Sequence, residues 1–353
     1  MLNALAKIHK GGEALAGRLF QDWERARKIL LAVSGGPDSV ALMLLAADWA
    51  RARAGALPAL EVATVDHALR PASRVEAETA ARWAGALGLP HEILVWEDAK
   101  PAARLQELAR EARYGLLFSH AARIGADVVA TGHHADDQAE TILFRLLRGS
   151  GLSGLAGMAI ARERGGFILS RPLLGLAKAD LLAVCESKSH PFISDPSNQN
   201  PAFARTGLRM LAERLAPEGL DRTALLRLGR RAARAEQALA GRTGEVRAAL
   251  PARREPGLFH ADASSLAREP EEIVLRLLAL EIRAAAGGAR PLRLDRLEAL
   301  TDGLLRAIRL ETPFAATLGG AALRLSADAV LTIRAEALRR RPPETPPGNE
   351  CRK

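Results

Sequence analysis

Short apolar runs alternate with longer segments of helical periodicity over the first 131 residues. Four runs of five or six mostly apolar residues occur at 28–33, 60–65, 91–96 and 127–131. Helix-length segments separate them, at 39–53, 74–87 and 105–124. Strands that alternate with helices in this way predict an α/β fold with a parallel, doubly wound sheet. Such sheets bind ligands beyond the carboxyl ends of their strands, so the residues that follow each run are candidates for chemistry.

The pattern changes beyond residue 149. Segments of helical pattern rich in Ala, Leu and Arg cover residues 207–250 and 271–310, and the second is interrupted near Gly287. Residues 313–334 indicate short strands joined by a Gly-Gly turn. A mostly helical second domain is therefore expected after the α/β domain.

These patterns divide the chain into three parts. We expect an α/β domain over residues 1–215, a basic helical domain with a short β-like end over 216–338, and a disordered, Pro-rich, basic tail over 339–353. No run approaches the roughly 18 apolar residues that span a bilayer, so no membrane association is expected. The first residues lack the apolar core of a signal peptide, which favours the cytoplasm.

Cysteine content and net charge narrow the classes of function. Cys185 and Cys351 cannot make a disulfide framework or a four-thiolate metal site, and neither is next to a motif in the sequence. Lys and Arg number 50 against 41 acidic residues, a net charge of +9, of which residues 216–353 hold +6. This excess favours a polyanionic partner such as nucleic acid. A solvated Arg-rich surface without a partner is the alternative.

A six-residue motif follows the first predicted strand and opens the next helix. Its residues are Ser34, Gly35, Gly36, Pro37, Asp38 and Ser39. Glycines let a backbone approach an anion closely, Pro presets φ for a first helical turn, and a helix N-terminus favours phosphate. A carboxylate beside phosphate suits Mg²⁺ or the orientation of a nucleophile, which makes Asp38 the candidate metal ligand. The chain contains no Gly-Lys pair, so this is not a Walker A loop.

This motif resembles the pyrophosphate loop of the PP-loop ATP pyrophosphatase superfamily. The resemblance implies cleavage of ATP between its α- and β-phosphates, adenylation of a carbonyl or carboxyl oxygen, and displacement of AMP by a nucleophile. Relatives that insert sulfur carry catalytic or cluster-binding cysteines, which have no counterpart beside the motifs of this sequence. An amine is therefore the expected nucleophile.

A second polar motif, residues 132–141, follows the fourth predicted strand. If a helix starts near Asp136, then Asp137 and Glu140 lie one turn apart on one face, where two carboxylates could hold Mg²⁺ or an ammonium group. A two-metal phosphohydrolase is the rival interpretation. It would use the histidines and aspartates that follow the second and fourth strands: Asp66, His67, His133, His134, Asp136 and Asp137.

Three weaker signals lie elsewhere in the α/β domain. Asp66 and His67, at the end of the second strand, could line an adenosine pocket or orient a loop, and Asp66 could equally be a helix cap. Arg110 and Arg113 are one helical turn apart. The Gly-rich segment 149–157 suits either closure over a substrate or a flexible connector.

Taken together, these motifs resemble the tRNA(Ile)-lysidine synthetase family over about residues 28–210. The matching stretches are 34–39, 65–70, 109–114, 132–141, 145–158, 171–174 and 195–198. Two departures occur near the end of this region. Phe192-Ile-Ser stands where the family usually has an aromatic residue and an acid, and Arg205-Thr-Gly-Leu-Arg209 replaces Arg-Asn-x-x-Arg.

The resemblance implies an ATP-dependent ligase whose nucleotide-binding catalytic domain is residues 1–215. ATP, with Mg²⁺ on Asp38, would adenylate O2 of the wobble cytidine in isoleucine tRNA with a CAU anticodon. The ε-amine of free L-lysine would then displace AMP from C2 and form lysidine. The basic helices after residue 216 would hold the tRNA, and a homodimer is compatible with the sequence.

The resemblance also implies roles for single residues. The phosphate loop with Asp66, His67 and His133 would bind ATP. Asp137 and Glu140 would position lysine and take its proton, and Arg113 would hold either the lysine carboxylate or the α-phosphate. Two other interpretations stay open. A different amidating ligase of the superfamily would have no use for the basic domain. A non-catalytic RNA-binding protein would have no use for Asp38, Asp137 and Glu140.

Overall fold

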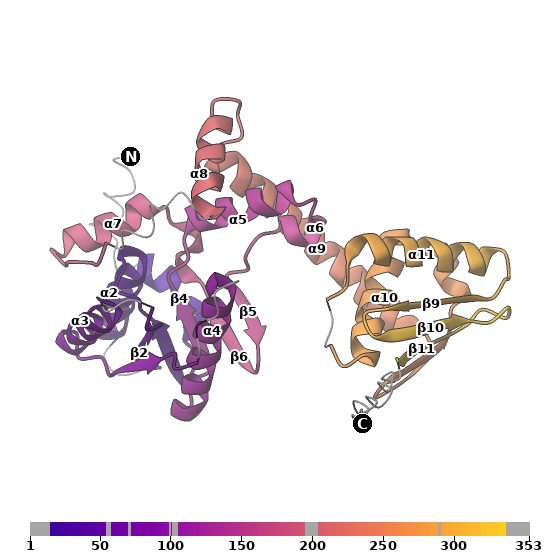
Figure 1. Ribbon diagram of the computed structural model, residues 1–353, viewed down its shortest axis with the longest axis horizontal. Helices are drawn as coiled ribbons and strands as arrows, with labels where there is room; N and C mark the ends of the chain where they lie inside the picture. Colours follow the sequence, from indigo (N-terminus) through magenta and orange to yellow (C-terminus); the bar gives the residue numbers. More distant parts are fainter. Residues whose placement is uncertain are drawn as a thin grey trace, which may run out of the picture. The chain divides into compact units, whose positions relative to one another are not determined.

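The computed structural model describes residues 15–53, 58–69, 72–98, 100, 105–194, 204–288 and 291–336. The chain forms two compact units, Met1–Ala233 and Arg234–Lys353 (Figure 1). The predicted tail, 339–353, and the motif at 195–198 lie outside the described residues. No helix in the described part of the chain is long and apolar enough to cross a membrane.

A six-stranded sheet forms the centre of the first unit. In spatial order its strands are β3 (His91–Val95), β2 (Ala59–Asp66), β1 (Lys28–Ala32), β4 (Val128–Thr131), β6 (Phe167–Ser170) and β5 (Ala161–Arg164). All neighbouring strands are parallel except β5, which pairs antiparallel with β6 at one edge. The predicted fold class, a parallel doubly wound sheet, is therefore confirmed.

Helices cover both faces of this sheet because its central strand is apolar on both sides. Ile29 and Leu31 of β1 pack with α2 (Pro37–Ala52), α3 (Ala72–Ala86) and α7 (Lys178–Ser187). Leu30 and Ala32 point the other way and pack against α4 (Leu105–Ile124) (Figure 1). The alternation of side chains along a strand thus assigns each helix to its face.

The strand order reverses between β1 and β4, and we call the region at the carboxyl ends of these two strands the crevice. The chain proceeds from β1 outward through β2 to β3, then returns to the other side of β1 to form β4. Loops that leave β1 and β4 therefore diverge, and this reversal of strand order is where α/β sheets bind ligands. The phosphate-loop motif follows β1, and α5 (Ala135–Leu147) with its polar start follows β4.

The remaining helices of the first unit correct one prediction. The expected continuous helix at 207–250 is two helices, α8 (Ala204–Leu215) and α9 (Arg222–Ala249). Pro217 and Gly219, whose φ is +91°, lie in the break. The boundary between the two compact units lies within α9, after Ala233, whereas the sequence pattern predicted a domain boundary after residue 215, at the end of α8. Short helices occur at η1 (Gln21–Trp23), α6 (Leu152–Leu155) and η2 (Pro172–Gly175).

The second unit combines helices with an antiparallel sheet. Its strands, in spatial order, are β7 (Ala252–Glu255), β8 (Leu258–Asp262), β11 (Val330–Ala335), β10 (Ala321–Leu325) and β9 (Phe314–Leu318). The short helix η4 (Ser264–Arg268) follows β8, and α10 (Glu271–Ala285) and α11 (Leu294–Arg309) bury their apolar faces in a core shared with the sheet. The predicted helices and the strands near residue 317 are confirmed, and β7 and β8 add strands that the sequence pattern did not indicate.

Candidate functional site

The phosphate-loop motif forms the turn between β1 and α2 and leaves the start of the helix open. Gly36 is the N-cap and Pro37 the first helical residue, and no side chain caps the helix. Ser39 braces the loop from inside: its Oγ accepts a 3.1 Å hydrogen bond from Ser34 N and donates one of 2.9 Å to Gly36 O. The uncapped N–H groups at a braced helix N-terminus form a typical phosphate site.

A segment that follows α7 lies against this loop. The N–H of Ile193 donates a 2.9 Å hydrogen bond to Gly35 O. Gly35 has φ of +88°, and a Cβ there would lie only 2.5 Å from Cδ1 of Ile193. Glycine is therefore required at position 35 both for its backbone angle and for this contact.

Cys185, which is not next to any motif in the sequence, lies under the loop through tertiary packing. Its thiol contacts the carbonyl oxygen of Pro37, with an Sγ–O distance of 3.6 Å, although the two residues are far apart in the chain. The side chain is fully buried, and burial raises the pKa of the thiol to about 11. A buried thiol of high pKa supplies no thiolate at neutral pH, so Cys185 packs the loop and does not act as a nucleophile.

Gly132, at the end of β4, brings the second polar motif to the phosphate loop. A Cβ at this position would lie 2.8 Å from the backbone oxygen and 2.9 Å from the backbone carbon of Asp38. Its φ is not positive, so glycine is needed for close approach and not for a turn. The following residue, His133, shares a 2.8 Å hydrogen bond with Thr131 through Nδ1.

His134 joins Asp38 to the acidic start of α5. Its Nε2 lies 3.6 Å from a carboxylate oxygen of Asp38 and 3.5 Å from one of Asp137, and its Nδ1 lies 3.5 Å from Asp136. Although burial lowers it, the hydrogen bonds to Asp136 and Asp38 and the charge of Asp137 raise the pKa of His134 to about 9. The 3.2 Å bond from Asp136 N to Nδ1 would instead require a neutral ring. We favour the imidazolium, because three surrounding carboxylates outweigh one N–H contact.

Asp38 fits a single-carboxylate Mg²⁺ site. Its Oδ1 is buried and has no hydrogen-bond partner in the structure, so one oxygen is available inside the crevice. Mg²⁺ in nucleotide sites is commonly held by one or two carboxylates and the substrate phosphates. The described residues contain no group of three or more His, Cys, Asp or Glu side chains placed to bind a metal.

The acidic side chains of α5 accept hydrogen bonds from arginine side chains and from backbone N–H groups. His134 occupies the N-cap position, and its backbone N–H donates a 3.2 Å hydrogen bond to Asp137; the helix begins at Ala135, which confirms the predicted start. Glu140 accepts a 2.5 Å hydrogen bond from Nε of Arg209, on α8. Asp136 accepts hydrogen bonds from Arg222 at 3.0 Å and from the N–H of Lys178 at 2.8 Å.

Ser34, His67 and Arg113 line one small cavity of ≈ 70 Å³ between β1, β2 and α4. Nδ1 of His67 is buried there without a hydrogen-bond partner, and burial, followed by the charge of Arg113, lowers the pKa of this imidazole. Asp66 points elsewhere: its Oδ1 accepts hydrogen bonds from Ala68 N at 2.8 Å and Ser73 Oγ at 2.6 Å. His67 and Arg113 therefore line a cavity that reaches the phosphate loop at Ser34, while Asp66 stabilises the start of α3.

The Gly-rich segment after α5 is tied to that helix. The side chain of Gln138 exchanges two hydrogen bonds with the backbone of Met158, at 2.7 and 2.9 Å. Arg145 donates bonds of 2.8 Å to the carbonyl oxygens of Gly154 and Gly157. Residues 149–157 are thus fixed beside α5 by side-chain hydrogen bonds. Three residues of this region were not among the predicted site residues: Gln138, His134 and Arg209.

The first half of α9 presents a basic surface. Its inner side packs on α5 and α6, where a Cβ at Gly229 would lie 2.5 Å from Ile142 Cδ1. Its outer side carries the α9 arginine face: Arg227, Arg230, Arg231 and Arg234. All four are exposed, and none forms an ion pair or hydrogen bond with another described residue.

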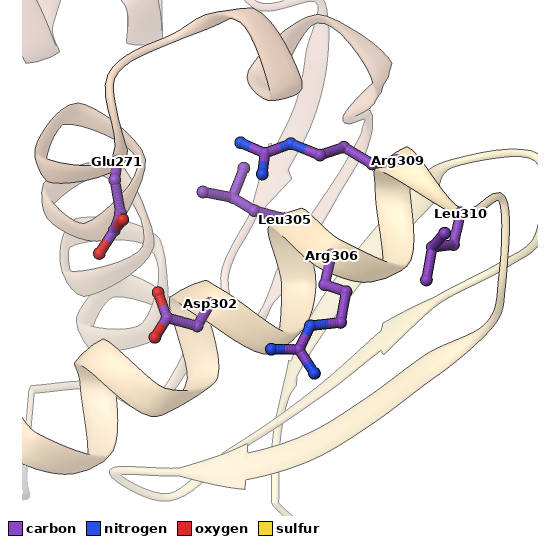
Figure 2. Close-up of a pocket in the computed structure, with 6 residues that line it drawn as sticks. All are labelled: Glu271, Asp302, Leu305, Arg306, Arg309 and Leu310. Carbon is purple, nitrogen blue, oxygen red and sulfur yellow. The ribbon is translucent and has the colours of Figure 1, made fainter.

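The second unit contains a wider, open pocket of ≈ 290 Å³ (Figure 2). Glu271, at the start of α10, and Asp302, Arg306 and Arg309 of α11 line it with two leucines. None of the residues expected to carry chemistry belongs to this pocket. The crevice at the ends of β1 and β4 is therefore the candidate site, because the phosphate loop and the carboxylates of α5 meet there around His134.

Comparison with known proteins agrees with this assignment. Residues 12–215, more than half of the chain, match the family model of the PP-loop domain. A tRNA(Ile)-lysidine synthase of Methylobacterium sp. (strain 4-46) is 50% identical over 90% of this chain and 91% of its own length. One from Rhodopseudomonas palustris is 45% identical over 92% and 96%. Among solved structures, the U34-tRNA thiolase NcsA of Methanococcus maripaludis shares the fold, with a TM-score of 0.53, 16% identity, and 64% and 80% of the two chains covered.

Proposed function

The chain belongs to the tRNA(Ile)-lysidine synthase family, and from that membership we propose that it joins free L-lysine to C2 of the wobble cytidine in isoleucine tRNA with a CAU anticodon. Membership makes it an ATP-dependent tRNA-modifying ligase. One observation supports the finer proposal best. The phosphate loop and the acidic start of α5 meet in one crevice, with His134 within 3.6 Å of carboxylates from both.

The first half-reaction is adenylation of the cytidine. O2 of the base attacks the α-phosphorus of ATP, a new P–O bond forms, and the bond to the β-phosphate oxygen breaks. The open N-terminus of α2 binds the departing pyrophosphate, because its N–H groups and dipole favour negative charge. Asp38 would hold Mg²⁺, which spreads the charge of the phosphates when bound. His67 lines the cavity next to the phosphate loop and would border the nucleotide, and Asp66 supports the loop that carries His67. His133, held by Thr131 at the end of β4, would contact the nucleotide from that side.

The second half-reaction is attack by lysine. The ε-nitrogen forms a bond to C2, the C2–O bond breaks, and AMP leaves with that oxygen. The lysine ammonium must first lose a proton, and Asp137 is our candidate to take it, because Asp137 and Asp38 of the phosphate loop share Nε2 of His134. Glu140 holds the lysine ammonium in place. Because Glu140 already accepts a hydrogen bond from Arg209, the lysine ammonium and Arg209 must share this carboxylate. Arg113 binds either the lysine carboxylate or the α-phosphate.

The tRNA is held by contacts outside the crevice. We assign part of this binding to the α9 arginine face, because four unpaired guanidiniums on one helix face repel one another unless a polyanion covers them. The cytoplasm, where tRNA and ATP are present, is the proposed compartment. A homodimer stays a prediction.

Release of pyrophosphate and of AMP tests the proposal. With ATP and Mg²⁺, we expect pyrophosphate release to require the tRNA but not lysine, and AMP release to require both. Ornithine, whose side chain is one methylene shorter than that of lysine, is the control amine: added in place of lysine, it tests how far AMP release depends on the length of the side chain. Pyrophosphate release that needs a small carboxylic acid and no tRNA would instead identify a different amidating ligase of the superfamily.

A further inference from the structure

Charged side chains line the β5–β6 edge of the sheet in the first unit, and the strand pairing shows which face of the sheet each one is on. In the β5–β6 hairpin, Arg162 pairs with Leu169 and Arg164 with Phe167, while Glu163 pairs with Ile168. Leu169 and Phe167 belong to the core on the α4 side of the sheet. Since directly paired residues share a face, both arginines lie on the α4 side and the glutamate lies on the other.

Arg164 continues this row onto α4 through contacts with two aromatic side chains of that helix. Its guanidinium carbon lies 4.6 Å from the ring centre of Tyr114 and 5.5 Å from that of Phe118. Arg110 approaches the same Tyr114 ring at 5.4 Å and Arg113 at 6.0 Å. Stacked aromatic rings form the floor beneath them, with Tyr114–Phe118 at 6.0 Å and Phe118–Phe167 at 5.5 Å.

We define the hairpin face as Arg110, Arg162 and Arg164, three exposed arginines without an ion pair or hydrogen bond to any described residue. Glu107 lies one turn before Arg110 on the same stripe of α4 and has a partner of its own. The neighbouring Arg171 is buried, and burial, with the charges of Arg110 and Arg162, lowers the pKa of its guanidinium. The three exposed arginines, with Arg171 next to them, thus outnumber the nearby acids of α4, Glu107 and Glu111.

The hairpin face leads into the candidate site. Arg113 lies over the Tyr114 ring and also lines the cavity that contains Ser34 of the phosphate loop. Guanidinium planes held on aromatic rings keep their donors directed outward and lose little freedom when they bind phosphate. A polynucleotide whose reactive base enters the crevice would therefore meet this row of cations next to it.

We propose that the hairpin face binds backbone phosphates of the RNA substrate, as a contact independent of the α9 arginine face. The proposal rests on the proposed function, since it takes tRNA as the substrate. The partner is a phosphodiester chain: three separate guanidiniums in a row match successive phosphates better than they match one compact anion.

The test is a salt titration of tRNA affinity with the full-length chain. The variant R162A/R164A removes two charges from the face, and R18A/R25A removes two exposed, unpaired charges that precede β1. We expect R162A/R164A to weaken binding at low salt by about tenfold and to flatten the slope of log K against log salt by about 1.4–1.8. R18A/R25A should leave the slope unchanged, and ATP binding should be equal in both.

A charge-conserving variant separates RNA binding from folding. R162K/R164K keeps both charges, so the salt slope should stay at the wild-type value even if affinity falls modestly through the loss of planar stacking. Equal slopes for wild type, R162A/R164A and R18A/R25A would show that the arginines only protect the sheet edge, and would overturn the proposal while leaving the proposed function intact. A wild-type chain that does not bind tRNA at all would overturn both.

Discussion

Substitution of Gly132 by alanine is expected to damage the active site without touching a catalytic side chain. The added Cβ would lie 2.8 Å from the oxygen of Asp38, about 0.6 Å inside the 3.4 Å at which ordinary contact begins. The opposing atoms belong to the backbone of the first turn of α2, so no side-chain rotation can relieve the overlap. The phosphate loop must move away from β4 instead.

The cost follows from this geometry. Overpacking of this kind destabilises a protein by about 1–3 kcal/mol, and each kcal/mol lowers the Tm by about 2–4 °C in a unit of this size. A shift of several tenths of an ångström in the loop relative to His134 and Asp137 would slow pyrophosphate release by about 10–100-fold, given the sensitivity of catalysis to position.

Pyrophosphate release and thermal unfolding of Gly132→Ala measure the two effects. Gly85→Ala is the matched control, because Gly85 lies within α3 and has no atom within 4 Å of an added Cβ. The control should keep full activity and gain up to about 1 kcal/mol of stability from its better helix propensity. A Gly132→Ala enzyme with wild-type rates would refute the claim that the close approach of β4 to α2 builds the site.

The remaining predictions concern single roles. Asp38→Ala should abolish pyrophosphate release while tRNA affinity stays within about twofold, and a wild-type rate would mean that Asp38 only occupies the first turn of α2. Glu140→Gln should impair lysine transfer more than pyrophosphate release, whereas equal losses would indicate a metal ligand. Alanine at the three arginines of the α9 face before residue 234 should flatten the salt slope of tRNA binding by about 2–3, and an unchanged slope would make this face a solvated surface. Glu281→Gln should lower the stability of the chain by about 3 kcal/mol, because a carboxylate that is only 2% exposed holds Arg247 and Arg254 at 2.8 and 2.9 Å; an unshifted unfolding curve would contradict it.

Much of the fold could be predicted because local pattern and tertiary environment agree in the central sheet. β1 and β4 are buried on both faces of the sheet, so nearly all their residues are apolar. A short, continuous apolar run of this kind predicts a buried strand without knowledge of its neighbours. The β5–β6 hairpin escaped prediction because β5 is an edge strand whose four residues are all exposed, and its sequence, Ala-Arg-Glu-Arg, has no apolar alternation to detect.

The site could be predicted only as far as it is continuous in sequence. The phosphate loop and the carboxylates of α5 were found because each lies within a short motif after a strand. Arg209 and Cys185 reach the site through tertiary packing. No local pattern marks Cys185, and the motif that contains Arg209 does not indicate that this residue pairs with Glu140. The close contact of Gly132 with Asp38 could not be predicted, because it depends on the pairing of β4 beside β1.

The most direct test of the account is the chemical fate of lysine. The tRNA with a CAU anticodon is incubated with the chain, ATP, Mg²⁺ and lysine that carries an isotope label in its ε-amine, and its nucleosides are then analysed by mass spectrometry. The account predicts the labelled nitrogen on C2 of the wobble cytidine, with one AMP released for each lysine incorporated and no incorporation without ATP. Label on another nucleotide, on a small-molecule product, or on no product would contradict it.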